Sequence, residues 1–213
     1  MNATAKLVRW TAIGVSAIWA AVIFFTGLEL ESNTRKVLSY VPSVAGALVV
    51  AFDLWLWKIP GVSRLTGRPH LWGTWRVELR TSAKAVIPKG GTRGPIHGAM
   101  VVEQTFWTMA VQFYTQESSS SSISAALVNK TDSKQSKSLL FTYTNSPRQA
   151  HLHRSPQHSG TCRLDVTGIS PASLVGTYWT DRITAGDMTL TLLDRQDDRP
   201  REEALGAAGV ATV

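Results

Sequence analysis

Two long apolar stretches near the start of the chain predict a helical hairpin. Residues 10–28 contain no charged side chain, and residues 37–57 contain only Asp53. At about 1.5 Å of rise per residue, each stretch is long enough to cross a hydrocarbon core of roughly 30 Å. The short connection, residues 29–36, suits a tight link between antiparallel helices. We therefore expect residues 1–58 to hold two transmembrane helices.

Basic residues around the hairpin predict its orientation. More of them flank the hairpin than lie in the connection, which predicts that both chain ends are cytoplasmic. A cleaved signal peptide is the alternative for the first stretch, but its apolar run is longer than a usual h-region and no clear cleavage site follows. Asp53 is interpreted as pairing or snorkelling near Lys58, with a functional acid inside the membrane as the alternative. The basic residues are Lys6, Arg9, Lys58, Arg64 and Arg68 in the flanks, and Arg35 and Lys36 in the connection.

After a linker rich in Pro and Gly at residues 59–68, apolar positions alternate with polar ones, a pattern typical of strands. In the first such segment, Trp75, Val77 and Leu79 alternate with charged residues. Turn-rich pieces separate the segments that follow. Seven further strands are expected near residues 98–103, 106–115, 120–128, 138–145, 160–166, 174–180 and 187–193.

Eight short strands within residues 69–194 predict an all-β domain. An eight-stranded antiparallel up-and-down barrel of the lipocalin type closes its own edges and can hold one small ligand, and a sandwich is the alternative. Gly73 and Trp75 form the G-x-W arrangement of lipocalin and avidin barrels, in which the Trp plugs one end. The tail, residues 195–213, is charged and then rich in small residues, so we expect it to be disordered.

Composition narrows the choice of partner. The net charge is +7, and residues 76–163 hold eleven Lys or Arg against four Asp or Glu, which favours anionic partners over cationic ones. Solubilising loop lysines are the alternative explanation. The single cysteine, Cys162, excludes an intrachain disulfide and a Cys-rich metal site. His151, His153 and His158 lack carboxylate or Cys partners at a metal-binding spacing, and no nucleophile elbow or phosphate loop occurs. We expect neither an enzyme nor a metal or cofactor site.

The order of several motifs resembles a known family. After the two apolar helices come PHLWGTW, EQTFWTMAVQFYTQESSSSSISAAL, LLFTYTNSP, HSGTCRL and LVGTYWTDRITAG. This arrangement resembles the two-transmembrane β-barrel effectors of bacterial CBASS anti-phage systems, which are STING-like cyclic-nucleotide sensors associated with CD-NTases. The resemblance implies that the barrel binds a cyclic dinucleotide made by a partner nucleotidyltransferase. It also implies that the activated protein forms a homo-oligomer, contacts membrane lipid and disrupts the inner membrane, which causes abortive infection. The barrel would then lie in the cytoplasm, and no DNA or RNA partner is implied.

A cyclic dinucleotide presents two phosphates and two bases, so its receptor needs cationic or hydroxyl donors together with aromatic or amide groups. Arginine beside a strand is favoured for the phosphates because its planar guanidinium binds phosphate oxygens bidentately, and both Arg163 and Arg182 qualify. The predicted ligand-binding residues are Thr115, Ser120, Ser122, Tyr143, Asn145, Tyr178, Thr180 and Arg182. The predicted structural residues are Gly73, Trp75 and Gly176.

Three alternatives stay open. The tyrosines could simply fill the barrel, and Arg182 could pair with Asp181 or Glu78. The whole domain could instead be a membrane-anchored, lipocalin-like binder of an apolar small molecule, which predicts a dry apolar interior. A filled barrel that serves only as an interaction domain is the third reading. A sensor, by contrast, predicts a pocket that contains Arg, Ser and Thr.

Overall fold

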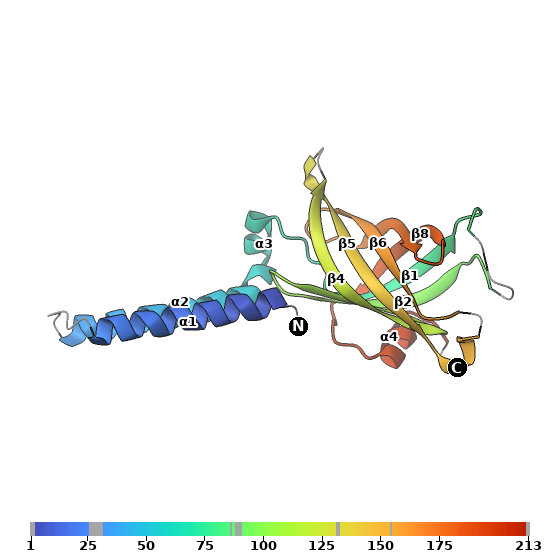
Figure 1. Ribbon diagram of the computed structural model, residues 1–213. Helices are drawn as coiled ribbons and strands as arrows, with labels where there is room; N and C mark the ends of the chain where they lie inside the picture. Colours follow the sequence, from blue (N-terminus) through green and yellow to red (C-terminus); the bar gives the residue numbers. More distant parts are fainter. Residues whose placement is uncertain are drawn as a thin grey trace. The chain divides into compact units, whose positions relative to one another are not determined.

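The structure is a computed structural model that describes residues 3–25, 32–85, 87, 91–130, 133–153 and 155–211. The chain forms two compact units, and Figure 1 labels most of their helices and strands. The first unit comprises residues 1–66 together with the turn at residues 105–108, and the second comprises residues 67–104 and 109–213.

The first unit is built on the expected pair of helices. These are α1 (Ala3–Phe25) and α2 (Ser32–Leu54), followed by η1 (Leu56–Lys58) and α3 (Pro60–Thr66). The long helices approach closely where Ser16 Oγ lies 2.9 Å from the Ala12 carbonyl oxygen of its own helix and 2.8 Å from the Pro42 carbonyl oxygen of α2. Gly46 faces this contact, and a Cβ there would lie 3.4 Å from Ser16 Oγ, an ordinary van der Waals distance.

The membrane-spanning role of the hairpin stays a prediction. In the part of the chain that the structure describes, none of the helices combines the length and the apolar character needed to cross a bilayer. Residues 26–31, which include the end of the first expected span, lie outside the described residues. Asp53 is buried near the end of α2, and its Oδ1 accepts a hydrogen bond of 3.3 Å from the Trp107 N–H in the turn at residues 105–108. The expected linker, residues 59–68, is largely helical because α3 occupies it.

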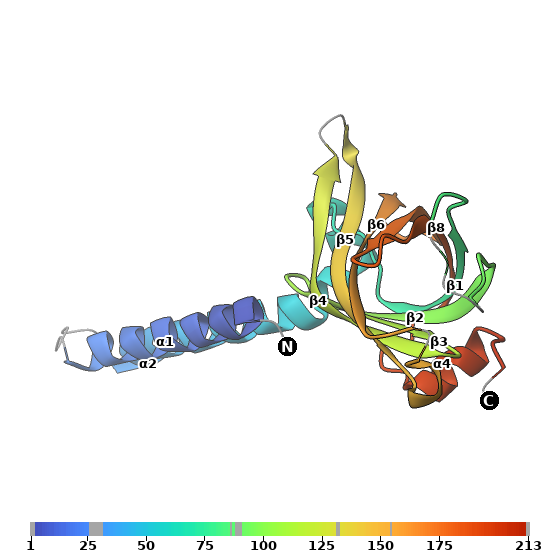
Figure 2. The ribbon, with the colours of Figure 1, turned by 45° about the vertical axis from the view of Figure 1, so that its right-hand side comes forward.

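The second unit is a closed barrel of eight antiparallel strands in sequence order. Each strand pairs with the next, and β8 pairs with β1, so the barrel is confirmed and the sandwich is excluded. Figure 2 shows the strands arranged around the interior. The strands are β1 (Gly73–Thr81), β2 (Ile96–Gln104), β3 (Met109–Thr115), β4 (Ser118–Lys130), β5 (Ser133–Pro147), β6 (His158–Thr167), β7 (Ser173–Thr180) and β8 (Ala185–Asp194).

One end of the barrel is packed with apolar side chains. Trp75 is fully buried there, and its indole Nε1 donates a hydrogen bond of 2.9 Å to the Leu71 carbonyl, a placement that a plug requires. Gly73 has a φ of 124°, and a Cβ there would lie 2.3 Å from the Asp194 carbonyl oxygen. A Cβ at Gly176 would lie 1.9 Å from the Arg163 carbonyl oxygen. Backbone approaches this close leave no space for a side chain at either glycine.

The C-terminal segment corrects the expectation of disorder over residues 195–213. Residues 195–211 are described, and they include the helix α4 (Arg201–Ala207). Its buried Ala204 and Leu205 pack against Ala99 and Val101 of β2, on the outer face of the barrel. Composition misled here because small side chains bury little area individually, yet a complementary barrel surface suffices to order them.

Candidate functional site

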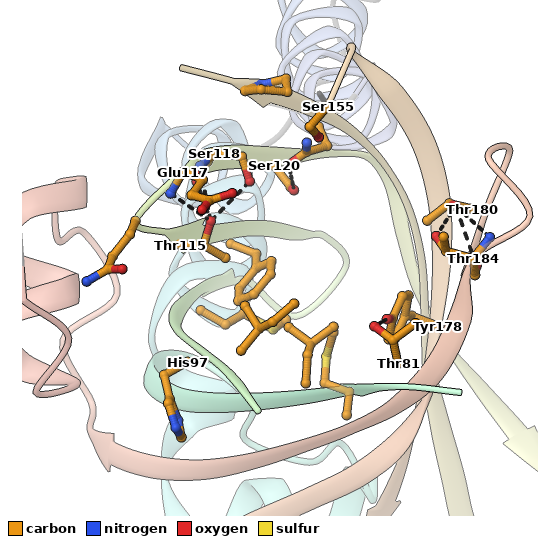
Figure 3. Close-up of a pocket in the computed structure, with 18 of the residues that line it drawn as sticks. Thr81, His97, Thr115, Glu117, Ser118, Ser120, Ser155, Tyr178, Thr180 and Thr184 are labelled. Atoms are coloured by element: carbon orange, nitrogen blue, oxygen red, sulfur yellow. Dashed lines mark hydrogen bonds between the residues drawn. The ribbon is translucent and has the colours of Figure 1, made fainter. Parts of the chain in front are cut away.

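A cavity of about 780 Å³ opens at the end of the barrel opposite Trp75 (Figure 3). This volume lies within the roughly 300–1,000 Å³ typical of small-molecule sites. The inward positions of β5 change toward it from Phe141 through Tyr143 to Asn145, which is from apolar to polar. Because alternate strands run in the same direction, the carboxyl ends of β1, β3, β5 and β7 meet at this cavity.

The cavity gathers seven of the eight predicted ligand-binding residues. Ser122 does not line it: its Oγ accepts a hydrogen bond of 2.9 Å from the Val111 N–H, at the last position before the register of β4 shifts. Arg163 is exposed on β6 between the buried Cys162 and Leu164, so it faces away from the interior. Ligand contact by the seven stays a prediction; they are Thr115, Ser120, Tyr143, Asn145, Tyr178, Thr180 and Arg182.

Arg182 follows β7 and presents its guanidinium to neutral groups. Nη1 donates a hydrogen bond of 3.0 Å to Ser155 Oγ, and Nη2 lies 3.4 Å from Nε2 of His158. The Nε of Arg182 is buried and has no hydrogen-bond partner among the described residues. A buried N–H without a partner costs free energy, so this group favours an acceptor that enters the cavity.

Neither acid that the sequence offered as a partner pairs with Arg182. Asp181 Oδ2 accepts a hydrogen bond of 2.9 Å from the Ser159 N–H, and Glu78 forms an ion pair of 2.7 Å with Arg80. Over the described residues, no ion pair involves Arg182. The alternative of a salt bridge to either acid is therefore excluded, and the guanidinium beside the cavity makes no ion pair with a described residue.

The surroundings of His158 lower its pKa and so favour the neutral imidazole. Burial lowers its pKa most, the nearby Arg182 cation lowers it further, and a hydrogen bond to the Pro156 carbonyl opposes both. Nδ1 lies 3.1 Å from that carbonyl oxygen, so this nitrogen carries the proton and Nε2 is an acceptor facing Arg182. Asn145 Oδ1 accepts a hydrogen bond of 2.9 Å from Ser120 Oγ, and Asn145 Nδ2 lies 3.4 Å from the protonated Nδ1, a contact between two donors that is not a hydrogen bond. A row of polar side chains therefore leads from β4 across β5 and β6 to Arg182.

Two tyrosines form an apolar wall of the cavity next to these polar side chains. Tyr143 fits because the neighbouring strand has Gly160, where a Cβ would lie 2.4 Å from the tyrosine hydroxyl. The Tyr178 hydroxyl lies 2.9 Å from Thr81 Oγ1, a contact drawn in Figure 3. Burial raises the pKa of both phenols, and it raises the pKa of Cys162 to about 12. The wall is therefore uncharged at neutral pH, and Cys162 is a thiol rather than a nucleophilic thiolate.

Hydroxyl groups lie on opposite sides of the cavity. Figure 3 shows Thr115 and Ser118 on one side and Thr180 and Thr184 on the other. Thr115 Oγ1 accepts hydrogen bonds from the N–H of Ser118 at 3.0 Å and of Glu117 at 3.3 Å, and the hydroxyls of Thr180 and Thr184 lie 2.6 Å apart. These groups offer donors and acceptors without adding charge.

Several lining residues escaped the sequence prediction. Thr81, Ser118, Ser155, His158 and Thr184 all line the cavity. The period-two pattern contained a signal for three of them, since Thr81 follows Leu79 by two positions, Ser118 precedes Ser120 by two, and His158 precedes Cys162 by four. Ser155 and Thr184 lie outside the strands, where alternation stops.

Comparison with known proteins identifies this barrel. A family model described as Cap15, cyclic dinucleotide receptor domain, matches residues 66–192. The chain belongs to this family. A similar protein is CD-NTase-associated protein 15 from Staphylococcus schleiferi, which is 26% identical over 182 residues, covering 82% of this chain and 92% of the relative. The resemblance to CBASS cyclic-nucleotide sensors is thereby confirmed.

The matched region contains the barrel except the last two residues of β8 and, with it, most of the cavity lining. Helix α4 follows the matched region, and the hairpin α1–α2 precedes it. Any role of these flanking segments must therefore be argued from their own contacts.

Proposed function

We propose that this protein is a CBASS effector that binds a cyclic dinucleotide inside the barrel, with one phosphate on Arg182. The observation that carries the proposal is the buried Nε of Arg182, which has no hydrogen-bond partner among the described residues and belongs to a cation that forms no ion pair with them. A phosphate oxygen supplies both the acceptor and the charge, and charge-assisted hydrogen bonds of this kind are the strong ones. Ser155 and Thr180 lie in the same cavity and add hydroxyl donors.

The rest of the ligand fits the remaining walls. The bases need uncharged surfaces and hydrogen-bonding groups at their edges, which Tyr143, Tyr178 and the Ser120–Asn145 pair provide. A monomeric barrel has no twofold axis through its cavity, so the two halves of the ligand meet different residues. This asymmetry gives the site a way to discriminate between bases.

A binder of apolar small molecules is the competing function. An apolar ligand would occupy the cavity without satisfying the Arg182 Nε, at a cost of roughly 1–3 kcal/mol for the unmet hydrogen bond. It would also exclude water from the neighbouring polar side chains of Ser120, Asn145 and His158. The arginine and the hydroxyls therefore favour an anion.

The output is proposed to follow binding rather than catalysis, without a cofactor and without DNA or RNA. The relative's association with a CD-NTase supports a nucleotidyltransferase as the source of the ligand. The exposed Trp10, Ile18 and Phe24 on α1 support contact with lipid. In this proposal the hairpin lies in the inner membrane, the barrel lies in the cytoplasm, and ligand-driven oligomers disrupt the bilayer and abort the infection.

Calorimetry on the full chain in detergent tests the binding step. Cyclic di-GMP, cyclic di-AMP, cyclic GMP–AMP and cyclic di-UMP are titrated into the parent protein, and the tightest of them into two variants. Arg182→Ala is expected to weaken binding by roughly ten- to a hundredfold, because one charge-assisted contact is worth about 1.5–3 kcal/mol. Arg163→Ala removes the same charge from the outer face and is expected to leave the affinity within about twofold.

Equal affinity of a folded Arg182→Ala variant would exclude Arg182 from the site. Failure of the parent to bind any of the four dinucleotides, together with binding of an uncharged fatty alcohol, would favour the apolar alternative.

A further inference from the structure

The segment that follows the matched receptor domain reaches back to the rim of the cavity. Residues 208–211 line this rim after α4, and the Gln116 side chain donates a hydrogen bond of 2.8 Å to the Ala211 carbonyl. At the start of α4, Arg201 Nη2 donates to the Thr115 carbonyl at 2.6 Å and to the Gln116 carbonyl at 2.9 Å. The C-terminal segment therefore holds one short piece of backbone at two places.

That piece of backbone is the turn between β3 and β4, and it carries cavity residues. Thr115, Glu117 and Ser118 line the cavity, and the Thr115 hydroxyl accepts hydrogen bonds from the N–H groups of the two others. On its far side, the Arg148 N–H donates a hydrogen bond of 2.8 Å to the Glu117 carbonyl. Arg201 binds the turn from outside the barrel, on the side away from the cavity in which the ligand is proposed to lie.

Arginine suits this task because one planar guanidinium can serve several acceptors in a fixed geometry. Its Nη2 binds the two successive carbonyls while Nη1 pairs with Glu202 Oε1 at 2.8 Å. The Arg201 side chain is only 20% exposed, and the buried Ala204 and Leu205 fix its helix on the barrel. The packing of α4 therefore fixes the position of the hydrogen bonds from Arg201 to the two carbonyls.

We propose that Arg201 is a positioning residue for ligand binding, which holds the turn at residues 115–118 so that the hydroxyls of Thr115 and Ser118 face the cavity. This inference rests on the proposed function, since it concerns the same cavity. It assigns a role to a segment outside the matched receptor domain. Without Arg201, the turn samples other conformations, and the free-energy cost of ordering it on binding lowers the affinity for the ligand.

Amide hydrogen exchange and calorimetry on the full chain test this role. In Arg201→Ala, the Glu117 and Ser118 amides are expected to exchange faster than in the parent, while the amides of β6 and β7 are unchanged. Affinity for the dinucleotide that the parent binds most tightly is expected to fall by about three- to tenfold, the value of one or two hydrogen bonds. Glu202→Gln is the control, because it removes the exposed ion pair and leaves both carbonyl contacts in place.

A double-mutant cycle separates positioning from general stabilisation. If Arg201 acts through the turn, Thr115→Val and Arg201→Ala are expected to be less than additive in their effect on affinity, and additive effects would overturn the inference. Arg201→Lys keeps the charge but loses the fork, so it provides the same test if the alanine variant fails to fold. If the parent binds a dinucleotide and both Arg201 variants bind it with the same affinity, the role of Arg201 is overturned and the proposed function stands. If the parent binds no dinucleotide, the proposed function is overturned as well.

Discussion

The shape of the cavity depends on a single absent methyl group. Tyr143 lies directly across from Gly160 in the pairing of β5 and β6, and the tyrosine ring occupies the space that a Cβ would need. Larger residues on β6 would push this ring away from the wall. A tyrosine at this position is therefore compatible with the barrel only because its cross-strand neighbour is glycine.

Gly160→Ala is accordingly expected to lower the free energy of unfolding by roughly 1–3 kcal/mol, as overpacking does, and to weaken ligand binding. Urea unfolding of the full chain measures the first effect and calorimetry the second. Gly206→Ala is a matched control, because a Cβ there would meet no atom within 4 Å. In a helix that change is neutral or stabilises by up to about 1 kcal/mol. Equal stability of the two variants would contradict the argument.

The lowered pKa of His158 makes stability depend on pH in a definite direction. In the unfolded chain this histidine titrates near its ordinary value of about 6.5, and in the folded barrel its pKa is lower, mainly because of burial. As pH falls below the unfolded value, the unfolded chain binds the proton first, so folding becomes less favourable. Arg182 and Asp181 are the charged groups that also act on this pKa, in opposite directions.

Urea unfolding at pH 7.5 and at pH 5.5 is expected to show a larger loss of stability in the parent than in His158→Gln, which cannot titrate. Both proteins lose whatever the other acidic and histidine groups contribute, so only the difference between them reports on His158. An identical change in the two proteins would mean that the folded and unfolded pKa values of His158 coincide.

Among single residues, alternation carried most of the prediction. Tyr143 and Asn145, or Tyr178 and Thr180, are two apart on one strand, so placing one of each pair inside the barrel placed the other. The same reasoning did not place Ser122 in the cavity lining: it stays in register opposite Tyr143, but its hydroxyl is used by the Val111 N–H, just before the register shift between Ser122 and Ser124. Such a contact depends on the pairing of neighbouring strands and leaves no mark on the local sequence.

At the level of elements, the eight strands were predictable because each has to bury one face. Their lengths were not: β5 begins at Ser133 rather than near residue 138, since pairing with β4 continues through polar residues. Helix α4 was missed because it is stabilised by the barrel wall beneath it rather than by its own sequence. Short helices are marginal in isolation, and tertiary packing decides whether they form.

This dependence on packing predicts a contrast between two leucines. Leu205→Ala is expected to lower the free energy of unfolding by about 2–4 kcal/mol, because Leu205 is fully buried between α4 and β2. Leu152→Ala makes the same change at a side chain that is 38% exposed, and is expected to cost less than about 1 kcal/mol. Chemical denaturation of both variants measures the contrast, and a small effect of Leu205→Ala would mean that α4 is held by its polar contacts alone.

At the scale of the whole molecule, the proposed function places ligand binding and membrane damage in different units. The barrel core and its cavity are built from residues of the second unit. Deleting residues 1–58 is therefore expected to leave a folded barrel that binds the dinucleotide with parental affinity but does not depolarise cells. Circular dichroism, calorimetry and a membrane-potential dye measure these three properties. Depolarisation by the truncated chain would show that the hairpin is not the damaging part.

Damage by the full chain is expected to require assembly. A single pair of helices cannot enclose an aqueous channel, since every polar backbone group must be satisfied within the bilayer, so a lesion has to recruit hairpins from several chains. A ligand shifts the equilibrium toward assembly only if it binds the assembled state more tightly than the resting one. Confinement in two dimensions raises the local concentration and makes that shift attainable with modest differences in affinity.

Cross-linking in membranes is therefore expected to show larger complexes after the dinucleotide is added, and permeabilisation of vesicles is expected to rise steeply with the density of the effector. Arg182→Ala is expected to show neither response at a ligand concentration that saturates the parent, whereas Arg163→Ala behaves like the parent. A steep dependence on density follows because several chains must meet before one lesion forms, which also keeps the effector silent while the signal is low. Permeabilisation that rises in proportion to density, by chains that stay monomeric with ligand bound, would contradict this mechanism and point to lipid disruption by individual hairpins.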